Sequence, residues 1–125
     1  MPYISATEAP VFTNIPGATF TGLASPSRGS RENAVWHVAL KAGTPAKPHR
    51  LTREEIFVVV AGRAMTSIDG AEFLLGAGDS LVVPAFTDFS IANPFDQTFA
   101  AIAVLPVGGR AILEGAEPFI PPWSA

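Results

Sequence analysis

Two side chains in the middle of the chain are suited to moving protons, His49 and Glu55. An imidazole titrates near neutral pH, and burial can bring a carboxyl group into the same range. A carboxylate beside an imidazole raises the pKa of the histidine and lowers that of the glutamate, whereas apolar burial opposes both changes. The pair is therefore the first candidate for general acid–base chemistry. The alternative is a pair that is hydrogen-bonded but inert.

The composition excludes several other kinds of chemistry. The chain has no cysteine, so it forms no disulfide, iron–sulfur cluster or thiol nucleophile, and we expect a cytoplasmic location because this composition fits a reducing compartment. The net charge is −3 and the Lys and Arg residues are scattered, so no nucleic-acid partner is expected. Residues 1–10 do not resemble a signal peptide, and no apolar run approaches the ~18 residues of a membrane span, so no membrane partner is expected.

The elements that must position the two side chains are short strands. Twelve prolines and eleven glycines interrupt the 125 residues throughout, and the runs between them are rich in Val, Ile, Phe and Ala. Many short strands at regular spacing predict an all-β sandwich or barrel. The predicted strands are residues 19–24, 34–41, 55–61, 63–68, 72–75, 80–83, 86–92 and 98–105.

Three local features add detail to this pattern. Asp69-Gly70, between two predicted strands, is a strong signal for a type I′ hairpin turn, which needs positive φ. Residues 55–61 are nearly all apolar, which predicts a strand buried on both faces. Residues 117–125 hold three prolines and three large apolar side chains, so we expect a tail that is non-helical, extended and packed on a surface.

Two stretches of the chain carry glycines, a histidine, a glutamate, a proline and an asparagine in fixed register. The first includes His49 and Glu55, and the second ends at Asn93. Together they resemble the two conserved motifs of the cupin family. The residues that match at the family spacing are Gly43, His49, Glu55, Gly62, Gly78, Pro84 and Asn93.

The resemblance implies an antiparallel jelly-roll β-barrel in which residues 1–125 form one cupin domain. Residues 43–93 would be its motif core, residues 1–42 its N-terminal strands and loop, and residues 98–125 its C-terminal strand and extended tail. Small barrels of this type expose strand edges, and the apolar tail needs cover, so we expect a homodimer.

The metal ligands of the family are only partly present. In the family, histidines and a glutamate drawn from both motifs hold a divalent metal. The residues at these positions here are His49, Leu51, Glu55 and Phe89. Leu51 and Phe89 have no lone pair to donate, so we expect no metal cofactor. The alternative is a divalent metal at His49 and Glu55 completed by His37, although strand alternation points His37 away from the interior.

The same register predicts an apolar cavity around the pair. His49 and Glu55 would face it together, and without an ion they would meet directly or through a water. The predicted ligand-binding residues are Trp36, Val38, Leu51, Phe57, Phe86, Phe89 and Ile91, with Phe86 near the mouth. Such a pocket is the default binding-site hypothesis for a domain of this kind.

Three functions are compatible with this site. The first is a metal-free enzyme of isomerase, cyclase or lyase type, in which His49 and Glu55 act on a small, fairly apolar organic molecule. The second is a non-catalytic ligand-binding or sensor barrel. The third is a metal-dependent oxygenase of the cupin type with a rebuilt site.

Overall fold

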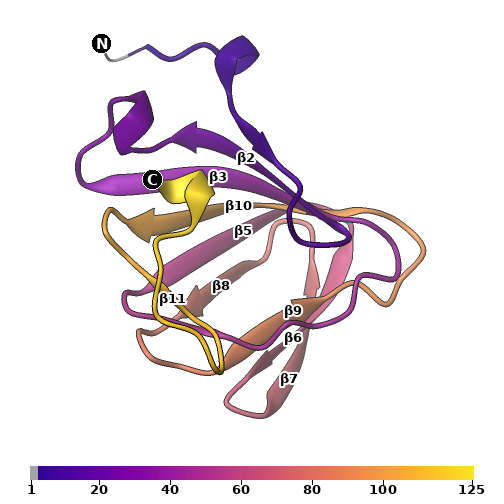
Figure 1. Cartoon of the computed structure of the whole chain (residues 1–125). Coiled ribbons are helices and arrows are strands. Elements are labelled where there is room, and N and C mark those ends of the chain that lie inside the picture. Colours follow the sequence, from indigo (N-terminus) through magenta and orange to yellow (C-terminus); the bar gives the residue numbers. More distant parts are fainter. Residues whose placement is uncertain (1–2) are drawn as a thin grey trace.

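The chain forms an antiparallel β-barrel, shown in Figure 1 as a computed structural model that describes residues 3–125. Within these residues, helix is limited to the short 3₁₀ turns η1 (Ala6–Glu8), η2 (Pro26–Arg28) and η3 (Pro122–Ser124). Every strand pairing in the described part of the chain is antiparallel. The predicted all-β jelly-roll fold is confirmed.

The strands form three sheets. The large sheet has the order β1-β2-β3-β10-β5-β8, a smaller sheet has the order β7-β6-β9, and β11 pairs with β4. Figure 1 shows the C-terminal segment, in yellow, running across the open side of the barrel from β11 to η3. The strands are β1 (Val11–Phe12), β2 (Ala18–Ala24), β3 (Asn33–Leu40), β4 (Arg50–Leu51), β5 (Glu55–Ala61), β6 (Arg63–Ile68), β7 (Ala71–Gly76), β8 (Ser80–Val83), β9 (Phe89–Ala92), β10 (Phe99–Pro106) and β11 (Ala111–Ile112).

Most predicted strands agree with the observed ones to within a residue, and β9 is the exception. The predicted hairpin turn is confirmed, since Asp69 and Gly70 have φ values of 47° and 83°. The strand predicted over residues 86–92 begins only at Phe89. Phe86 has a φ of 60°, which is incompatible with a strand, and it lies in the turn that precedes β9.

The prediction that β5 is buried on both faces is wrong for the single chain. Glu55, Phe57 and Val59 are buried on the inner face, whereas Val58 and Val60 on the outer face are 39% and 50% exposed. The strand alternates because β5 lies in the large sheet, whose inner face lines the core and whose outer face is left uncovered at Val58 and Val60 by residues 3–125.

Two motif residues hold the ends of the strands around the core. Gly62 turns the chain between β5 and β6 with a φ of 75°, and a Cβ there would collide with the backbone carbonyl of Thr98. The fully buried Asn93 donates its side-chain amide to the carbonyl oxygens of Leu40 (2.9 Å) and Gln97 (2.8 Å). These contacts close the barrel where β3 and β9 end and β10 begins.

The C-terminal tail packs on its own barrel. The indole of Trp123 stacks face to face on the ring of Phe20, with centroids 3.7 Å apart and planes 6° apart. The tail is not wholly extended as predicted, because residues of η3 form a 3₁₀ turn that begins with a proline at its first position.

Candidate functional site

The barrel encloses an apolar cavity of about 330 Å³ that opens at one side. Its wall combines the inner faces of β2, β3 and β5 with β9, the segment before β4 and the C-terminal segment. The apolar lining residues are Ile15, Pro16, Ala18, Phe20, Trp36, Val38, Leu40, Pro45, Ala46, Leu51, Phe57, Phe89, Ile91, Phe99, Ala111, Leu113, Phe119, Pro121 and Trp123. The polar lining residues are Thr44, Lys47, His49 and Glu55.

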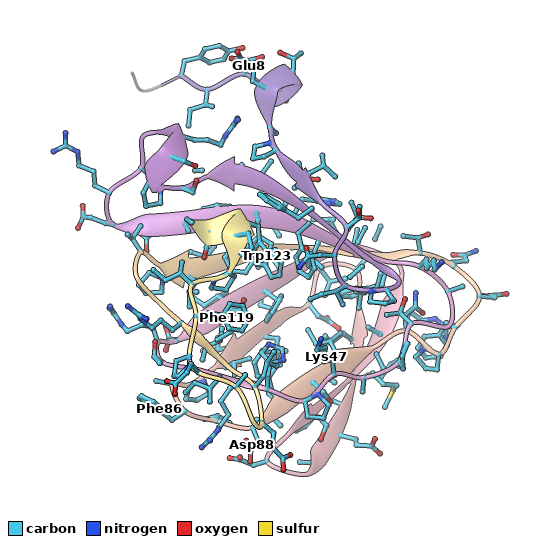
Figure 2. The ribbon with its side chains drawn as sticks, in the orientation of Figure 1. Glu8, Lys47, Phe86, Asp88, Phe119 and Trp123 are labelled. Atoms are coloured by element: carbon cyan, nitrogen blue, oxygen red, sulfur yellow. The ribbon has the colours of Figure 1, made fainter. Side chains whose placement is uncertain are left out.

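The structure brings together both predicted proton-transfer residues and most of the predicted walls. The predicted ligand-binding residues that line the cavity are Trp36, Val38, Leu51, Phe57, Phe89 and Ile91. Phe86 does not line it, so its predicted place at the mouth is corrected. Its positive φ turns the side chain out of the strand path, and the ring is 60% exposed (Figure 2).

His49 enters the cavity immediately before β4. Its backbone exchanges two hydrogen bonds with Phe89, and its ring lies 4.5 Å from the ring of Phe89 at a tilt of 50°. The Nδ1–H donates to the carbonyl oxygen of Lys47 at 2.9 Å, and because a carbonyl only accepts, the neutral ring keeps its free lone pair on Nε2. Burial lowers the pKa of His49 below 6.5; the bond to the Lys47 carbonyl opposes this shift, and the Lys47 ammonium adds to it.

Glu55 is the first residue of β5, and its side chain points inward, where only 3% of it is exposed. Its Oε1 atom is buried without a hydrogen-bond partner among residues 3–125. Burial alone raises the pKa of Glu55 well above 4.5, because no donor stabilises the carboxylate. Burial therefore favours the uncharged form of Glu55 over the carboxylate.

The acid and the base stay separate. Within the described chain His49 donates only to the Lys47 carbonyl, and no hydrogen bond joins it to Glu55, so the direct contact predicted as one alternative is not formed. Because both side chains line the cavity and no hydrogen bond joins them, each is available to contact a third molecule there.

The side chains at the family's metal positions do not fit its divalent ion. Leu51 and Phe89 are 3% and 2% exposed and present only carbon atoms to the cavity. Among residues 3–125 no three His, Cys, Asp or Glu side chains lie close enough together to hold an ion. His37 is on the outer face of β3 and does not line the cavity, as strand alternation predicted, so it cannot complete a site with His49 and Glu55.

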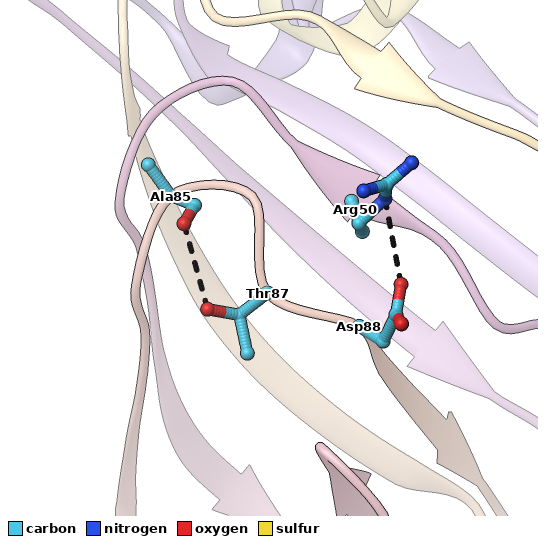
Figure 3. Close-up of polar contacts among 4 residues, drawn as sticks. All are labelled: Arg50, Ala85, Thr87 and Asp88. Atoms are coloured by element: carbon cyan, nitrogen blue, oxygen red, sulfur yellow. Dashed lines mark hydrogen bonds and ion pairs between the residues drawn. The ribbon is translucent and has the colours of Figure 1, made fainter.

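Three charged residues near the motif, Arg50, Glu54 and Asp88, do not line the cavity. Asp88 pairs with Arg50 across the surface, with Oδ1 and Nε 3.4 Å apart and side chains 78% and 45% exposed (Figure 3). Glu54 is also exposed, on the solvent side of its buried neighbour. An exposed ion pair of this kind contributes little to stability, and none of these groups can act inside the cavity.

Sequence reasoning missed the residues that reach the cavity from the ends of the chain. Ile15 and Pro16 come from the loop before β2, and Phe119 and Trp123 come from the C-terminal tail. Figure 2 shows Phe119 and Trp123 on the side of the barrel that the tail crosses, with Lys47 across from Phe119. The available signal was the apolar character of the tail, which indicated contact with a surface but not which surface.

Fold and site together define a small β-barrel with a mostly apolar cavity that opens at one side. Residues 36–105 match the family model of the cupin domain. The chain therefore belongs to the cupin family. No curated protein matches the chain at the sequence level.

Solved structures with low sequence identity share the fold. Polyketide cyclase RemF from Streptomyces resistomycificus superimposes with a TM-score of 0.78 at 16% identity, over 94% of this chain and 87% of the cyclase. An RmlC-like cupin from Shewanella frigidimarina superimposes with a TM-score of 0.73 at 19% identity, over 85% of this chain and 90% of the other. Salicylate 1,2-dioxygenase from Pseudoaminobacter salicylatoxidans, in a structure with gentisate, gives 0.71 at 21% identity, over 83% of this chain and 31% of the dioxygenase.

In the structure of the present protein, residues 3–125 contain no helix whose length and apolar character would let it cross a membrane.

Proposed function

We propose that the protein is an enzyme that carries out acid–base chemistry, of isomerase, cyclase or lyase type, on a small and largely apolar organic molecule without a metal. The observation that supports this most directly is the pairing of His49 and Glu55 in an apolar cavity without a hydrogen bond between them. General acid–base catalysis requires a placed donor and a placed acceptor, and burial shifts the pKa of Glu55 upward and that of His49 downward, which favours the protonated acid and the unprotonated base.

The simplest reaction that uses both groups is enolisation of a ketone. His49 Nε2 takes a proton from the carbon beside the carbonyl, and the C–H electron pair forms a carbon–carbon double bond. The carbonyl oxygen takes the proton of Glu55, so the enol is neutral and the step leaves an imidazolium at His49 and a carboxylate at Glu55. Return of the protons at other positions gives an isomer, and attack of the enol carbon on a second carbonyl of the same molecule closes a ring.

The comparison with RemF supports the cyclase form of this chemistry. RemF is described as a polyketide cyclase, and polyketides carry repeated carbonyl groups whose neighbouring carbons lose protons readily. A cavity of about 330 Å³ lies at the lower end of the volumes that proteins use for small ligands. A substrate of one or two fused rings is the size that this cavity favours.

Deuterium exchange tests the proposal without knowledge of the natural substrate. The aryl ketone 1-tetralone exchanges the protons beside its carbonyl slowly in neutral D₂O, and proton NMR follows their loss. We expect the wild-type protein to accelerate this exchange and His49→Ala and Glu55→Gln each to reduce the acceleration by roughly 10²- to 10⁴-fold.

His37→Ala and Glu54→Gln are the matched controls, because both residues have the same chemistry outside the cavity. Both control proteins should accelerate exchange like the wild type. Equal losses in control and cavity variants would contradict the assignment. The rate should also peak between two pKa values: it falls at low pH as His49 is protonated, and at high pH as Glu55 ionises.

A non-catalytic ligand-binding barrel is the second candidate. The apolar side chains of Leu51 and Phe89 favour it, because they turn the family's metal position into a wall that binds apolar groups. This function predicts that 1-tetralone binds without faster exchange and that binding survives His49→Ala.

We further propose that the enzyme works as a homodimer in the cytoplasm. The support for a dimer is the outer face of the large sheet, where Val58, Val60 and Val82 are 39%, 50% and 51% exposed. Apolar patches of this kind favour association, and β8 adds an open strand edge beside them. Light scattering on wild type and on Val58→Lys should give dimer and monomer masses respectively. The cytoplasmic location is supported by the cysteine-free composition.

A further inference from the structure

The C-terminal segment, residues 113–125, supplies a wall of the cavity that sequence reasoning did not identify. Its lining residues are Leu113, Phe119, Pro121 and Trp123. The segment folds back after β11, where Ala111 and Phe119 exchange backbone hydrogen bonds of 2.7 and 3.1 Å. It then crosses the open side of the barrel to η3 (Figure 1).

Aromatic packing, rather than a strand ladder, holds the far end of this wall. Trp123 stacks on Phe20 at 3.7 Å and meets the ring of Phe12 edge-on at 6.3 Å. Beyond Phe119 the hydrogen bonds recorded in residues 3–125 are local turns within η3 and two bonds from Ser27 to the carbonyl oxygen of Ala125. The position of the wall therefore depends on the rings that also line the cavity.

A second group of rings lies on the side of the cavity that is formed by the two segments resembling the cupin motifs. Phe89 packs against His49 with ring centroids 4.5 Å apart and against Phe57 at 6.0 Å. Both arrangements are tilted, so ring faces and edges are presented to the cavity rather than hidden in a flat stack. Aromatic side chains thus reach the same space from the tail and from the two conserved motifs.

We propose that the C-terminal segment is the specificity-determining wall of the site, and that it selects a planar aromatic molecule whose ring lies against Phe119 and Trp123. Aromatic rings attract one another beyond the area that they bury, whereas a saturated ring of the same skeleton is thicker and lacks this attraction. The orientation of the ligand, with a hydroxyl or carbonyl group toward His49 and Glu55, rests on the proposed function.

Calorimetric binding of two alcohols with the same carbon skeleton tests the proposal. 1-Naphthol is planar and aromatic, and decahydro-1-naphthol is saturated and puckered. We expect the wild type to bind 1-naphthol about tenfold more tightly than the saturated alcohol. Phe119→Leu and Trp123→Leu should abolish this preference, because leucine keeps the wall apolar but removes the rings.

Phe73→Leu is the control, since Phe73 is a partly exposed phenylalanine on β7 that does not line the cavity. It should keep the wild-type preference. Circular dichroism and thermal melting identify folded variants, and Phe119→Leu serves the test alone if Trp123→Leu does not fold. The proposal is overturned if the wild type binds both alcohols equally, if it binds neither at about 1 mM, or if folded tail variants keep the preference.

The result is independent of the exchange assay. Loss of exchange in His49→Ala concerns the proposed chemistry, and His49→Ala should still bind 1-naphthol in preference to the saturated alcohol. A His49→Ala protein that loses the preference while the tail variants keep it assigns selectivity to the side of the cavity formed by the two motif segments and overturns the proposal.

Discussion

The cavity and the outer surface of this barrel carry the same two kinds of titratable side chain. His49 and Glu55 line the cavity, whereas His37 lies on the outer face of β3 and Glu54 is exposed beside its buried neighbour. Burial shifts the pKa of each cavity residue toward its uncharged form. His37 is half-buried on the outer face and Glu54 is exposed, so neither is enclosed by the cavity wall.

This difference shows that position in the fold, more than residue type, makes a side chain suitable for proton transfer here. The inner face removes water from a carboxyl group that has no hydrogen-bond partner for Oε1, and the barrel holds it in that state. Leu51 and Phe89, at the family's ligand positions, contribute to the same placement. They line the cavity around His49 and Glu55 with carbon atoms rather than polar groups.

The largest effect should come from restoring ligands to the inner face. Leu51→His together with Phe89→His places nitrogen donors at the two apolar family positions, and we expect affinity for Zn²⁺ to rise by more than about a hundredfold. The wild type should purify with clearly less than one metal per chain. Titration with a competing chelator measures the affinity, and adding His49→Ala to the double variant should reduce it again. Wild-type protein with stoichiometric metal that is lost on His49→Ala would contradict this expectation.

Removal of the tail tests whether the cavity depends on its end segment. Truncation after Glu114 deletes the buried indole of Trp123 and exposes the face of Phe20 that it covers. Loss of a buried Trp typically costs ~3–5 kcal/mol, so the melting temperature should fall by about 10–20 °C. Phe73→Ala, an exposed site on β7, should change it little. An unchanged melting temperature would show that the tail is not part of the folded barrel.

The unpartnered acid in the cavity predicts a pH-dependent effect on stability. The unfolded chain releases the Glu55 proton from about pH 4.5 upward, whereas the folded chain keeps it because the folded pKa is raised. The folded state therefore loses stability as the pH rises above that value, by at most ~1.4 kcal/mol per pH unit.

Glu55→Gln removes this loss, so its advantage in free energy of unfolding over the wild type should grow as the pH rises. Urea unfolding at a series of pH values measures the difference. For Glu54→Gln, the free energy of unfolding should vary with pH in parallel with that of the wild type. Parallel curves for Glu55→Gln would show that the carboxyl is not buried as an acid.

The smallest effect concerns the outer turn that precedes β9. Phe86 holds a φ of 60° where the family motif has glycine, and its ring gains little from burial because it is 60% exposed. Phe86→Gly should therefore raise the free energy of unfolding by about 1 kcal/mol in chemical denaturation. Ala85→Gly, at a neighbouring position without positive φ, should lower it. A loss of stability in Phe86→Gly would mean that the ring has a contact worth more than the strain.

Much of the barrel could be predicted from local patterns. Alternation and the Asp69-Gly70 turn place β6 and β7, and the run from Glu55 to Ala61 matches β5 because side-chain alternation and turn chemistry are local properties. The two-residue strands β1, β4 and β11 were missed, since no periodicity can be read from so short a run.

The cavity was predictable only where a motif fixed the register. Trp36, Phe57 and Phe89 face inward because alternation and the family spacing determine their side. Ile15 and Trp123 could not be found in this way, because their contacts join distant parts of the chain and carry no local period. The prediction for Phe86 was wrong for a different reason. Its positive φ interrupts a run of residues whose pattern is otherwise typical of a strand.

The Glu55 carboxyl also gives the protein a spectroscopic label of its own. A carboxylic acid without a hydrogen bond to its oxygen vibrates at a higher infrared frequency than one in water, in a region free of amide absorption. The band belongs to a single residue, because Glu55 is the one acidic group in the described chain whose oxygen is buried without a partner. A downward shift of this band on mixing with a compound would report a hydrogen bond to the Glu55 carboxyl, and loss of the band would report transfer of its proton.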